Sequence, residues 1–320
     1  MKDLLELRSI IDREIDSLAH PNSPALLYRP IKYITQLKSK RIRPLLVLIA
    51  YQLFDEDIEK ALSPAIAIEL FHNFTLIHDD IMDNAPLRRG EQTVHKKWNN
   101  NVAILSGDVM MINAYQLLEK IDSNCFKEVL AVFSQTAVKV CEGQQLDIDF
   151  ESNNQVDIAD YIKMIKYKTA VLLAVSLQIG GIVAGAGKEE QDKLYNFGLN
   201  IGIAFQLKDD FLDVFGNPKV FGKKMGGDIL AKKKTFLYLK AMELADISTK
   251  DWLEMVYSSN NTEIKVSAVK EVFQKLNVEK YTLDMMQYYY KKAMSNLDLV
   301  NSDKKDLLID FANKLIDRVS

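Results

Sequence analysis

The sequence predicts an all-helical protein that folds as one large domain over residues 1–320. Apolar residues recur at the three- and four-residue spacing of an amphipathic helix along most of the chain, beginning with Leu4, Leu7, Ile11 and Ile15. Alternating Val, Ile and Thr runs bounded by turn residues, which are typical of strands, are scarce. Breaks between the periodic segments are short, and no stretch has the composition of a linker between domains.

Proline and serine mark the first expected helix boundaries. One apolar helix follows Pro44, and Ser63-Pro64 supplies a cap and a first-turn proline for the next, which runs about 20 residues to Asp83. Further helices are expected at about 102–120, 125–146, 158–185, 188–214, 233–246, 262–275, 277–296 and 302–318. The Gly- and Lys-rich stretch 215–232 is expected to be a functional or mobile loop.

Composition narrows the class of protein. With 48% hydrophobic and 27% charged residues, the 320-residue chain can bury a large core and still dissolve. A net charge of −3 argues against a nucleic-acid partner. Cys125 and Cys141 are too few for a disulfide framework, and the charged N-terminus is unlike a signal peptide, so we expect a cytoplasmic protein.

One uncharged stretch, Thr169 to Gly187, approaches the length of a membrane span. It contains Ser176, Gln178 and four glycines, and Lys168 lies at its edge. We therefore expect a helix buried at the centre of the protein rather than a membrane span.

The main chemical signal is a cluster that occurs twice. Each cluster has the pattern Asp-Asp-x-x-Asp at the end of an apolar helix: Asp79, Asp80 and Asp83, and again Asp209, Asp210 and Asp213. The first and last aspartates of each are four residues apart and share a helix face. Carboxylates in a last helical turn repel one another and oppose the helix dipole, at a cost of a few tenths to about 1 kcal/mol per contact.

A bound divalent cation would remove this cost. Carboxylate oxygens, with room for water and phosphate oxygens, suit Mg²⁺ rather than zinc, so all six aspartates are candidate metal ligands. A single cluster could be a solvated acidic helix end, but two copies with one spacing argue against that alternative. The Asp-x-Asp-x-Asp-Gly loop of an EF-hand does not occur.

Basic residues near the clusters are candidate phosphate ligands. Arg88-Arg89 follows the first cluster directly, and Lys40 and Arg43 lie near the start of another helix. A guanidinium group offers paired donors to phosphate oxygens, which favours a diphosphate ligand over the alternative of plain surface arginines.

Two polar residues lie on the same helix faces as the aspartates. His72 is seven residues before Asp79, and Gln206 is three before Asp209. A lone His or Gln on an apolar helix is usually a satisfied core residue, but each of these lies along the stripe that carries the carboxylates, which favours a role in the site.

Three lysines extend the candidate site. Lys168-Thr169 opens the uncharged helix, where an interior lysine needs an anion to be tolerated. Lys223 and Lys233 lie in or beside the long loop and could close over a bound phosphate.

At these residues the chain resembles the trans-isoprenyl diphosphate synthases, the farnesyl and geranylgeranyl diphosphate synthase family. The resemblance extends over nearly the whole chain, and its two aspartate motifs are highly specific when found together. It implies a single helical bundle around a deep central cavity, usually a homodimer. It also implies a reaction that joins an allylic diphosphate (dimethylallyl, geranyl or farnesyl) to isopentenyl diphosphate, with three Mg²⁺ ions bridging the allylic diphosphate.

The resemblance implies a role for each matched residue. The aspartates of both clusters would hold the metal and, with Lys168, serve catalysis. Isopentenyl diphosphate would be bound by Lys40, Arg43, His72 and Arg89. The allylic diphosphate would be held by Arg88, Lys168, Thr169, Gln206, Lys223 and Lys233. Two departures stand out, since the family commonly has Gly-Gly before Lys40, where this chain has Lys38-Ser39, and often has Thr at the position of Phe221.

The expected product is C15 to C20. Phe71, Phe74 and Thr75 lie one and two turns before Asp79 and would border the growing tail. Long-chain members of the family tend to have small residues at the position of Phe74, so its ring would form a floor. The resemblance points most closely to a geranylgeranyl-type synthase, with farnesyl diphosphate second.

Three alternatives remain open from sequence. A longer-chain polyprenyl diphosphate synthase would need a deeper pocket than Phe74 suggests. A class I terpene cyclase would carry one aspartate motif and an Asn/Ser/Glu motif, without a second diphosphate site. A non-catalytic subunit of a heteromeric synthase should have lost aspartates from one cluster.

Overall fold

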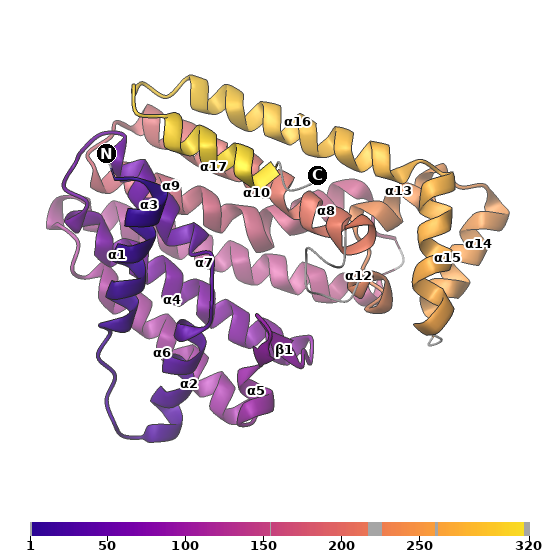
Figure 1. Cartoon of the computed structure of the whole chain (residues 1–320), viewed down its shortest axis with the longest axis horizontal. Helices are drawn as coiled ribbons and strands as arrows, with labels where there is room; N and C mark the ends of the chain where they lie inside the picture. The colour runs from indigo at the N-terminus through magenta and orange to yellow at the C-terminus, as the bar shows by residue number, and fades with distance from the viewer. Residues whose placement is uncertain (1, 154, 217–225, 260–261, 317–320) are drawn as a thin grey trace. The chain divides into compact units, whose positions relative to one another are not determined.

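The computed structural model describes residues 2–153, 155–216, 226–259 and 262–316, and it is almost entirely helical (Figure 1). The all-helical class predicted from sequence is therefore confirmed. Contacts group the chain into two compact units, the first comprising Met1–Gln135, Val175–Tyr195 and Val300–Leu307. The second comprises Thr136–Ala174, Asn196–Leu299 and Leu308–Ser320.

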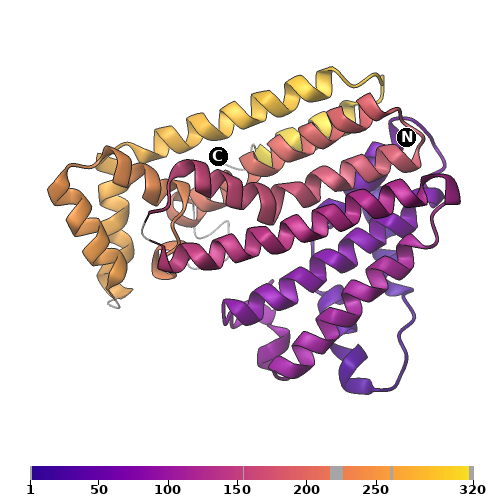
Figure 2. The ribbon, with the colours of Figure 1, turned by 180° about the vertical axis from the view of Figure 1, so that it is seen from behind.

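Unit 1 contains the N-terminal helices. In chain order they are α1 (Leu4–Asp16), α2 (Ala25–Gln36), α3 (Ile42–Gln52), α4 (Glu59–Met82), α5 (Val94–Lys97) and α6 (Asn100–Leu118). Helix α4 packs against α6 and α3, and both views of the ribbon show it alongside α6 (Figures 1 and 2). Between α4 and α5 lies a small antiparallel hairpin of β1 (Leu87–Arg88) and β2 (Glu91–Gln92).

Unit 2 contains most of the remaining helices. They are α8 (Ile158–Ile165), the π-helical segment η1 (Lys166–Ala170), α12 (Gly227–Leu230), α13 (Phe236–Leu244), α14 (Ile247–Ser258), α15 (Thr262–Lys275), α16 (Val278–Asp298) and α17 (Asp306–Ile316). Three long helices contribute residues to both units: α7 (Ser123–Ser152), α9 (Val171–Val183) and α10 (Lys188–Phe215). The first two residues of α17 also belong to unit 1. The core of unit 2 gathers buried aromatic side chains such as Tyr161, Phe211, Phe236 and Phe273.

Several boundaries differ from those expected. Helix α4 begins at Glu59, so Pro64 lies inside it and Ser63 is not its cap; the Ser63 hydroxyl instead donates to the carbonyl of Leu117 on α6. Helix α7 continues to Ser152, past the expected end near residue 146. Both extensions follow from burial of the helix against neighbours, which outweighs local signals.

Four helices were not expected: the short α5 and α12, and the longer α2 and α14. Helix α2 contains Pro30, which reads as a breaker in sequence. At the sixth helical position Pro30 has no N–H to donate to the Leu26 carbonyl, yet the helix continues, with Pro30 and Ile31 buried. Helix α14 has its own N-cap, because the Asp246 side chain accepts a hydrogen bond from the Thr249 amide. That cap was the signal that could have located α14.

The uncharged stretch lies in a helix that is long and apolar enough to cross a membrane, Ile158–Val183. In its apolar window, however, 78% of the residues are buried inside the protein. This is the burial expected of a core helix, as the polar Ser176 and Gln178 and the glycines suggested.

A buried ion pair ties α3 to the rest of unit 1. Arg41, which precedes α3 with a left-handed φ of 50°, donates to Glu69 of α4 at 2.7 Å and to Asp12 of α1 at 3.1 Å. A third bond reaches the Thr35 carbonyl at the end of α2. Arg41 and Glu69 are 5% and 1% exposed, so neither can exchange its partner for water.

We expect Arg41→Ala to lower the free energy of unfolding by about 3–5 kcal/mol, because Glu69 would keep its buried charge without a partner. Lys188→Ala is a suitable control, since Lys188 pairs with Asp192 on an exposed helix face and its removal should cost less than about 1 kcal/mol. Urea denaturation followed by circular dichroism measures both. Equal losses would contradict the structural role given to Arg41.

Candidate active site

The first aspartate cluster ends α4, with Asp83 as its C-cap. Asp80 is 1% exposed and is held by Arg88, whose Nε and Nη2 donate to Oδ1 at 3.0 and 2.6 Å. Burial, aided by the charge of Asp79, raises the pKa of Asp80, and Arg88 opposes that rise. Asp79 is partly exposed and Asp83 fully so, which leaves these two on the accessible face of the helix end.

The hairpin turn presents Arg89. Arg89 and Gly90 both have positive φ, 56° and 86°, which gives the tight two-residue turn that reverses the chain after β1. The Arg89 Nη1 atom is buried and has no hydrogen-bond partner among the residues the structure describes. A buried cationic donor without a partner is costly, and an anionic ligand would satisfy it.

His72 and Arg43 meet beside this turn. Arg43 Nη1 lies 3.0 Å from His72 Nε2. Burial, followed by the charges of Arg43, Arg89 and Arg88, lowers the pKa of His72 well below its usual value. The imidazole is therefore neutral, so its Nε2 accepts a hydrogen bond from Arg43 while Nδ1 carries the proton. The basic groups of unit 1 thus gather around a neutral histidine, and their positive charges would attract an anion.

The second cluster lies on α10. Asp210 is 5% exposed, accepting from the Tyr161 hydroxyl at 2.5 Å and from Gln206 Nε2 at 2.9 Å. Burial, then the charge of Asp228, raises the pKa of Asp210 well above its usual range, and both hydrogen bonds oppose this. Asp209 is exposed beside it.

Asp213 has a different task. Its two carboxylate oxygens accept hydrogen bonds from the amides of Gly227 and Asp228 at 3.1 and 2.9 Å. Its carbonyl accepts from the Gly226 amide at 2.7 Å. Asp213 therefore fixes the start of α12, just before the segment that carries Lys233.

Two lysines converge on one carboxylate of α7. Lys168 and Lys233 donate to Asp147 Oδ2 at 2.8 and 2.9 Å, and Lys233 also lies 3.4 Å from Glu151. Burial alone would raise the pKa of Asp147, but the two lysines lower it below its usual range. Asp147 therefore keeps two ammonium groups together in the absence of a ligand.

Lys168 and Thr169 lie on the π-helical segment η1, a local widening that often occurs at functional sites. Two glycines let neighbouring helices approach it closely. A Cβ atom on Gly143 of α7 would lie 2.2 Å from the Lys168 amide nitrogen, and one on Gly202 of α10 would lie 2.7 Å from the Ala170 Cα atom. No other residue type fits at either position without moving the backbone.

The expected floor residues belong to an aromatic cluster in unit 1. Phe71 and Phe74 are 1% and 8% exposed, with ring centroids 5.5 Å apart. Phe71 also packs edge-on against Phe133 of α7, which contacts Tyr115 of α6. Thr75 is half-buried, and its hydroxyl donates to the His72 carbonyl at 2.8 Å. Sequence reasoning had not named the second aromatic layer of Phe133 and Tyr115.

Comparison with known proteins identifies the family to which this chain belongs. Residues 24–276 match the sequence family described as Polyprenyl synthetase. The chain belongs to the polyprenyl synthetase family. A short chain isoprenyl diphosphate synthase from Methanocaldococcus jannaschii is 36% identical over 311 residues, which cover 97% of this chain and 94% of the relative.

Two further relatives agree. A geranylgeranyl diphosphate synthase from Methanosarcina mazei is 34% identical over 313 residues, covering 97% of this chain and 95% of the relative. A crystal structure of a geranylgeranyl pyrophosphate synthase, 44% identical, superposes with a TM-score of 0.94 and full coverage of both chains. The family identified from the aspartate motifs is therefore confirmed.

The structure assigns the predicted site residues of this polyprenyl synthetase to two groups. Unit 1 gathers Asp79, Asp80, Asp83, Arg43, His72, Arg88 and Arg89, with Lys40 exposed on the loop before α3. Unit 2 gathers Asp209, Asp210, Asp213, Lys168, Thr169, Gln206 and Lys233. Lys223 and Phe221 lie outside the described residues.

Two residues of unit 2 were missed from the sequence, Asp147 and Tyr161. Asp147 is four residues after Gly143, so the two share a face of α7, and a counter-charge for Lys168 was to be expected somewhere. Tyr161 is seven residues before Lys168 on one continuous helix, a spacing that repeats every two turns.

The donor chemistry of the clusters fits a divalent cation. Asp83, and Asp209 in unit 2, are exposed and Asp79 is partly exposed, and carboxylate oxygens are the ligand type that Mg²⁺ prefers. No group of three or more His, Cys, Asp or Glu side chains within the described ranges forms a ready-made metal site. A cation would therefore need oxygens from water or from a bound diphosphate to complete its shell.

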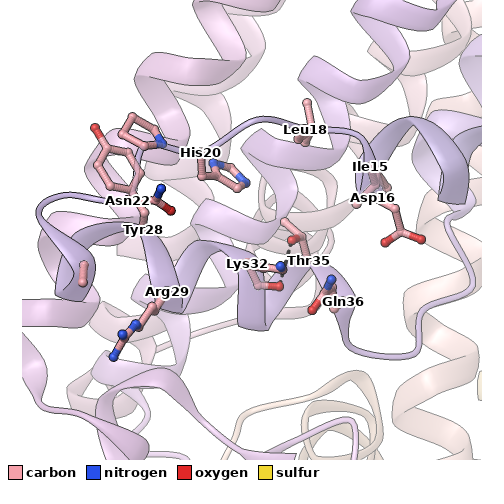
Figure 3. Close-up of a pocket in the computed structure, with 12 residues that line it drawn as sticks. Ile15, Asp16, Leu18, His20, Asn22, Tyr28, Arg29, Lys32, Thr35 and Gln36 are labelled. Atoms are coloured by element: carbon pink, nitrogen blue, oxygen red, sulfur yellow. Dashed lines mark hydrogen bonds between the residues drawn. The ribbon is translucent and has the colours of Figure 1, made fainter.

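A pocket of about 310 Å³ also occurs in unit 1, between the end of α1, the following loop and α2 (Figure 3). Its lining includes Asp16, His20, Tyr28, Arg29 and Lys32, and none of the predicted site residues. His20 and Tyr28 are stacked with ring centroids 6.4 Å apart. These side chains are mostly exposed, and nothing in their arrangement resembles the buried ionic groups of the two clusters.

The low pKa of His72 predicts a dependence of stability on pH. The unfolded state binds a proton at this residue below about pH 6.5, whereas the folded state does not, so stability should fall as the pH drops from about 7.5 to 5.5. His72→Asn should reduce that slope by up to about 1.4 kcal/mol per pH unit. His20 and His95, whose pKa values are also lowered, should preserve the remainder. Urea denaturation across this range measures the slope, and identical slopes would disprove the assignment.

Proposed function

We propose that this chain is a short-chain trans-prenyltransferase that joins isopentenyl diphosphate to an allylic diphosphate, forming geranylgeranyl or farnesyl diphosphate and releasing diphosphate. The observation that carries the proposal is the pairing, within each unit, of accessible aspartates with basic groups suited to a diphosphate. The names of the relatives, short chain isoprenyl and geranylgeranyl diphosphate synthase, support it.

Unit 1 is proposed to bind isopentenyl diphosphate. Arg43 and Arg89 supply donors, and the neutral His72 aligns Arg43 by accepting a hydrogen bond from it at Nε2. The buried Nη1 of Arg89 would gain its missing partner from a phosphate oxygen. Lys40, exposed nearby on the chain, would add a further charge.

Unit 2 is proposed to bind the allylic diphosphate. Lys168 and Lys233 already converge on Asp147, and a diphosphate would compete with that carboxylate for the hydrogen bonds they donate. Bound Mg²⁺, for which three ions are expected, would neutralise the diphosphate as it leaves. The exposed Asp83 and Asp209, with the partly exposed Asp79, would hold these ions.

For the reaction, the protein must stabilise the developing charges and exclude water. The allylic carbon–oxygen bond breaks with its electron pair going to diphosphate, and the double bond of isopentenyl diphosphate attacks the resulting cation. A proton is lost to form the new double bond, and we assign the departing diphosphate as its acceptor. Apolar side chains such as Phe74 exclude water that would quench the cation.

Two coarser features complete the proposal. Leu105 and Ile112, seven residues apart on α6, are 57% and 53% exposed, which supports a homodimer that would cover them. The cysteines are free, which fits a reducing cytoplasm. Incubation with labelled isopentenyl diphosphate and each allylic primer, with products separated by length, tests the activity; no prenyl product from any primer would refute it.

Turnover should require a divalent cation. We expect no turnover in excess chelator, and we expect turnover to recover when Mg²⁺ or Mn²⁺ is added. Asp79→Ala or Asp209→Ala should lower kcat by roughly 10³-fold or more with unchanged helical circular dichroism. Asp303→Ala, at an exposed aspartate outside both clusters, is the control and should retain full activity. Full activity in chelator would exclude the metal-dependent mechanism.

Product length should depend on Phe74. Phe74→Ala, alone or with Phe71→Ala, should open the floor and lengthen products by one or more five-carbon units. Phe311→Ala is a matched control, because Phe311 is also 8% exposed but lies on α17. It should cost about 3–5 kcal/mol of stability without changing product length. Chromatography of the dephosphorylated products decides, and wild-type products of C30 or above would overturn the assignment.

A further inference from the structure

Four side chains of unit 2 form a continuous hydrogen-bonded chain between two helices. The Tyr161 hydroxyl donates to Asp210 Oδ2 at 2.5 Å, Gln206 Nε2 donates to Asp210 Oδ1 at 2.9 Å, and the Thr169 hydroxyl donates to Gln206 Oε1 at 3.0 Å. Tyr161 and Thr169 lie on the continuous stretch α8–η1, and Gln206 and Asp210 lie one turn apart on α10. The chain thus contains two cross-links between the helices and one bond along α10.

We propose that Tyr161 is a positioning residue of the active site, which acts through Asp210 to hold Gln206 and Thr169 in place. The inference rests on the proposed function, which gives Gln206 and Thr169 to the allylic diphosphate. It assigns Asp210 a role different from that of the accessible Asp209 beside it.

The direction of every bond follows from Asp210. Both of its carboxyl oxygens accept hydrogen bonds, so the Gln206 amide turns its nitrogen toward Asp210 and its carbonyl oxygen toward Thr169. The Thr169 hydroxyl must then donate to that carbonyl oxygen. The lone pairs of the Thr169 hydroxyl and the second N–H of Gln206 then remain for a ligand. One carboxyl group therefore sets the donor and acceptor pattern of two binding residues.

Tyr161 is what keeps Asp210 in this orientation. Its side chain is 1% exposed and packs in the aromatic core of unit 2, so the phenol has no freedom to follow a moving partner. Among the residues that the structure describes, its hydroxyl is the one donor to Asp210 Oδ2. Loss of the phenol would leave Asp210 Oδ2 without that hydrogen bond, so the carboxyl group could turn toward another donor.

The position of Lys168 depends on the same hydrogen-bonded side chains. Thr169 follows Lys168 on η1, where the π-helical backbone is held between Gly143 and Gly202. The Thr169–Gln206 bond fixes the side of η1 that faces α10, while Lys168 reaches Asp147 of α7. Holding both in advance lowers the reorganisation required when substrate binds.

A double-mutant cycle of Tyr161→Phe and Thr169→Val tests the inference. Each change deletes one hydroxyl and leaves the carbon frame. Each single variant should lower kcat/KM for the allylic substrate by about 10- to 100-fold, as loss of an orienting partner does. If Tyr161 acts through Thr169 and Gln206, kcat/KM of the double variant should lie within about threefold of the value for the less active single variant. KM for isopentenyl diphosphate should stay within about twofold of wild type, because its proposed ligands lie in unit 1.

Binding of a non-reactive allylic thiodiphosphate in the presence of Mg²⁺, measured by calorimetry, gives a readout apart from turnover. Its dissociation constant should rise in Tyr161→Phe and change little more in the double variant. Tyr290→Phe is the matched control, because the Tyr290 hydroxyl donates to Asn313 at the same 2.5 Å. It should leave both measurements within about twofold of wild type.

Activities are divided by the folded fraction from circular dichroism, so that partial unfolding is not counted as lost positioning. Multiplicative losses in the double variant, or a Tyr161→Phe enzyme within about twofold of wild type, would overturn the inference. A Tyr161→Phe chain that does not fold would also overturn it, since the hydroxyl would then serve folding. Absence of any prenyl product from the wild-type protein would instead refute the proposed function, and the inference with it.

Discussion

Repulsion between carboxylates is the constraint around which this site is built. Six aspartates at the ends of two helices would oppose both one another and the helix dipoles, and the protein answers this locally in each unit. In unit 1 Arg88 donates hydrogen bonds to Asp80 from two guanidinium nitrogens. In unit 2 Tyr161 and Gln206 each donate a hydrogen bond to Asp210. Burial, followed by the charges of neighbouring carboxylates, still keeps the pKa of both aspartates raised. A bound cation would relieve the part of that rise that comes from carboxylate repulsion.

The same logic explains the basic groups. Arg43 and Arg89 are brought together with a histidine that remains neutral, so no further positive charge is added before a ligand arrives. Lys168 and Lys233 are kept together by Asp147, the carboxylate that the proposed diphosphate would displace. Each unit therefore stores an arrangement of charge that becomes more favourable on binding an anion, at the expense of stability without it. Substrate binding should accordingly stabilise the protein as well as start its chemistry.

Much of this could be predicted from the sequence, and the remainder has physical reasons for being hidden. Helical periodicity predicts the fold class, and the aspartate spacing indicates which carboxylates share a face. Pattern alone does not show that Asp147 would serve two lysines, 21 and 86 positions away, or that Tyr161 would reach Asp210 over 49 positions. Such pairs depend on which helices pack together. The close seating of η1 against Gly143 and Gly202 is likewise visible only once α7 and α10 are in place.

The two clusters share a division of labour that follows from helix geometry. The first and last aspartates of Asp-Asp-x-x-Asp are four residues apart and lie on one helix face. The second aspartate is rotated from the first by about 100°, toward the protein interior. Accordingly Asp80 and Asp210 are 1% and 5% exposed, while Asp79 and Asp209 remain accessible. Asp83 is also exposed, whereas Asp213 is engaged by the amides that open α12. The motif thus combines residues that can face a ligand with a neighbour that fastens the helix end. That combination explains why adjacent carboxylates are tolerated at the end of a helix.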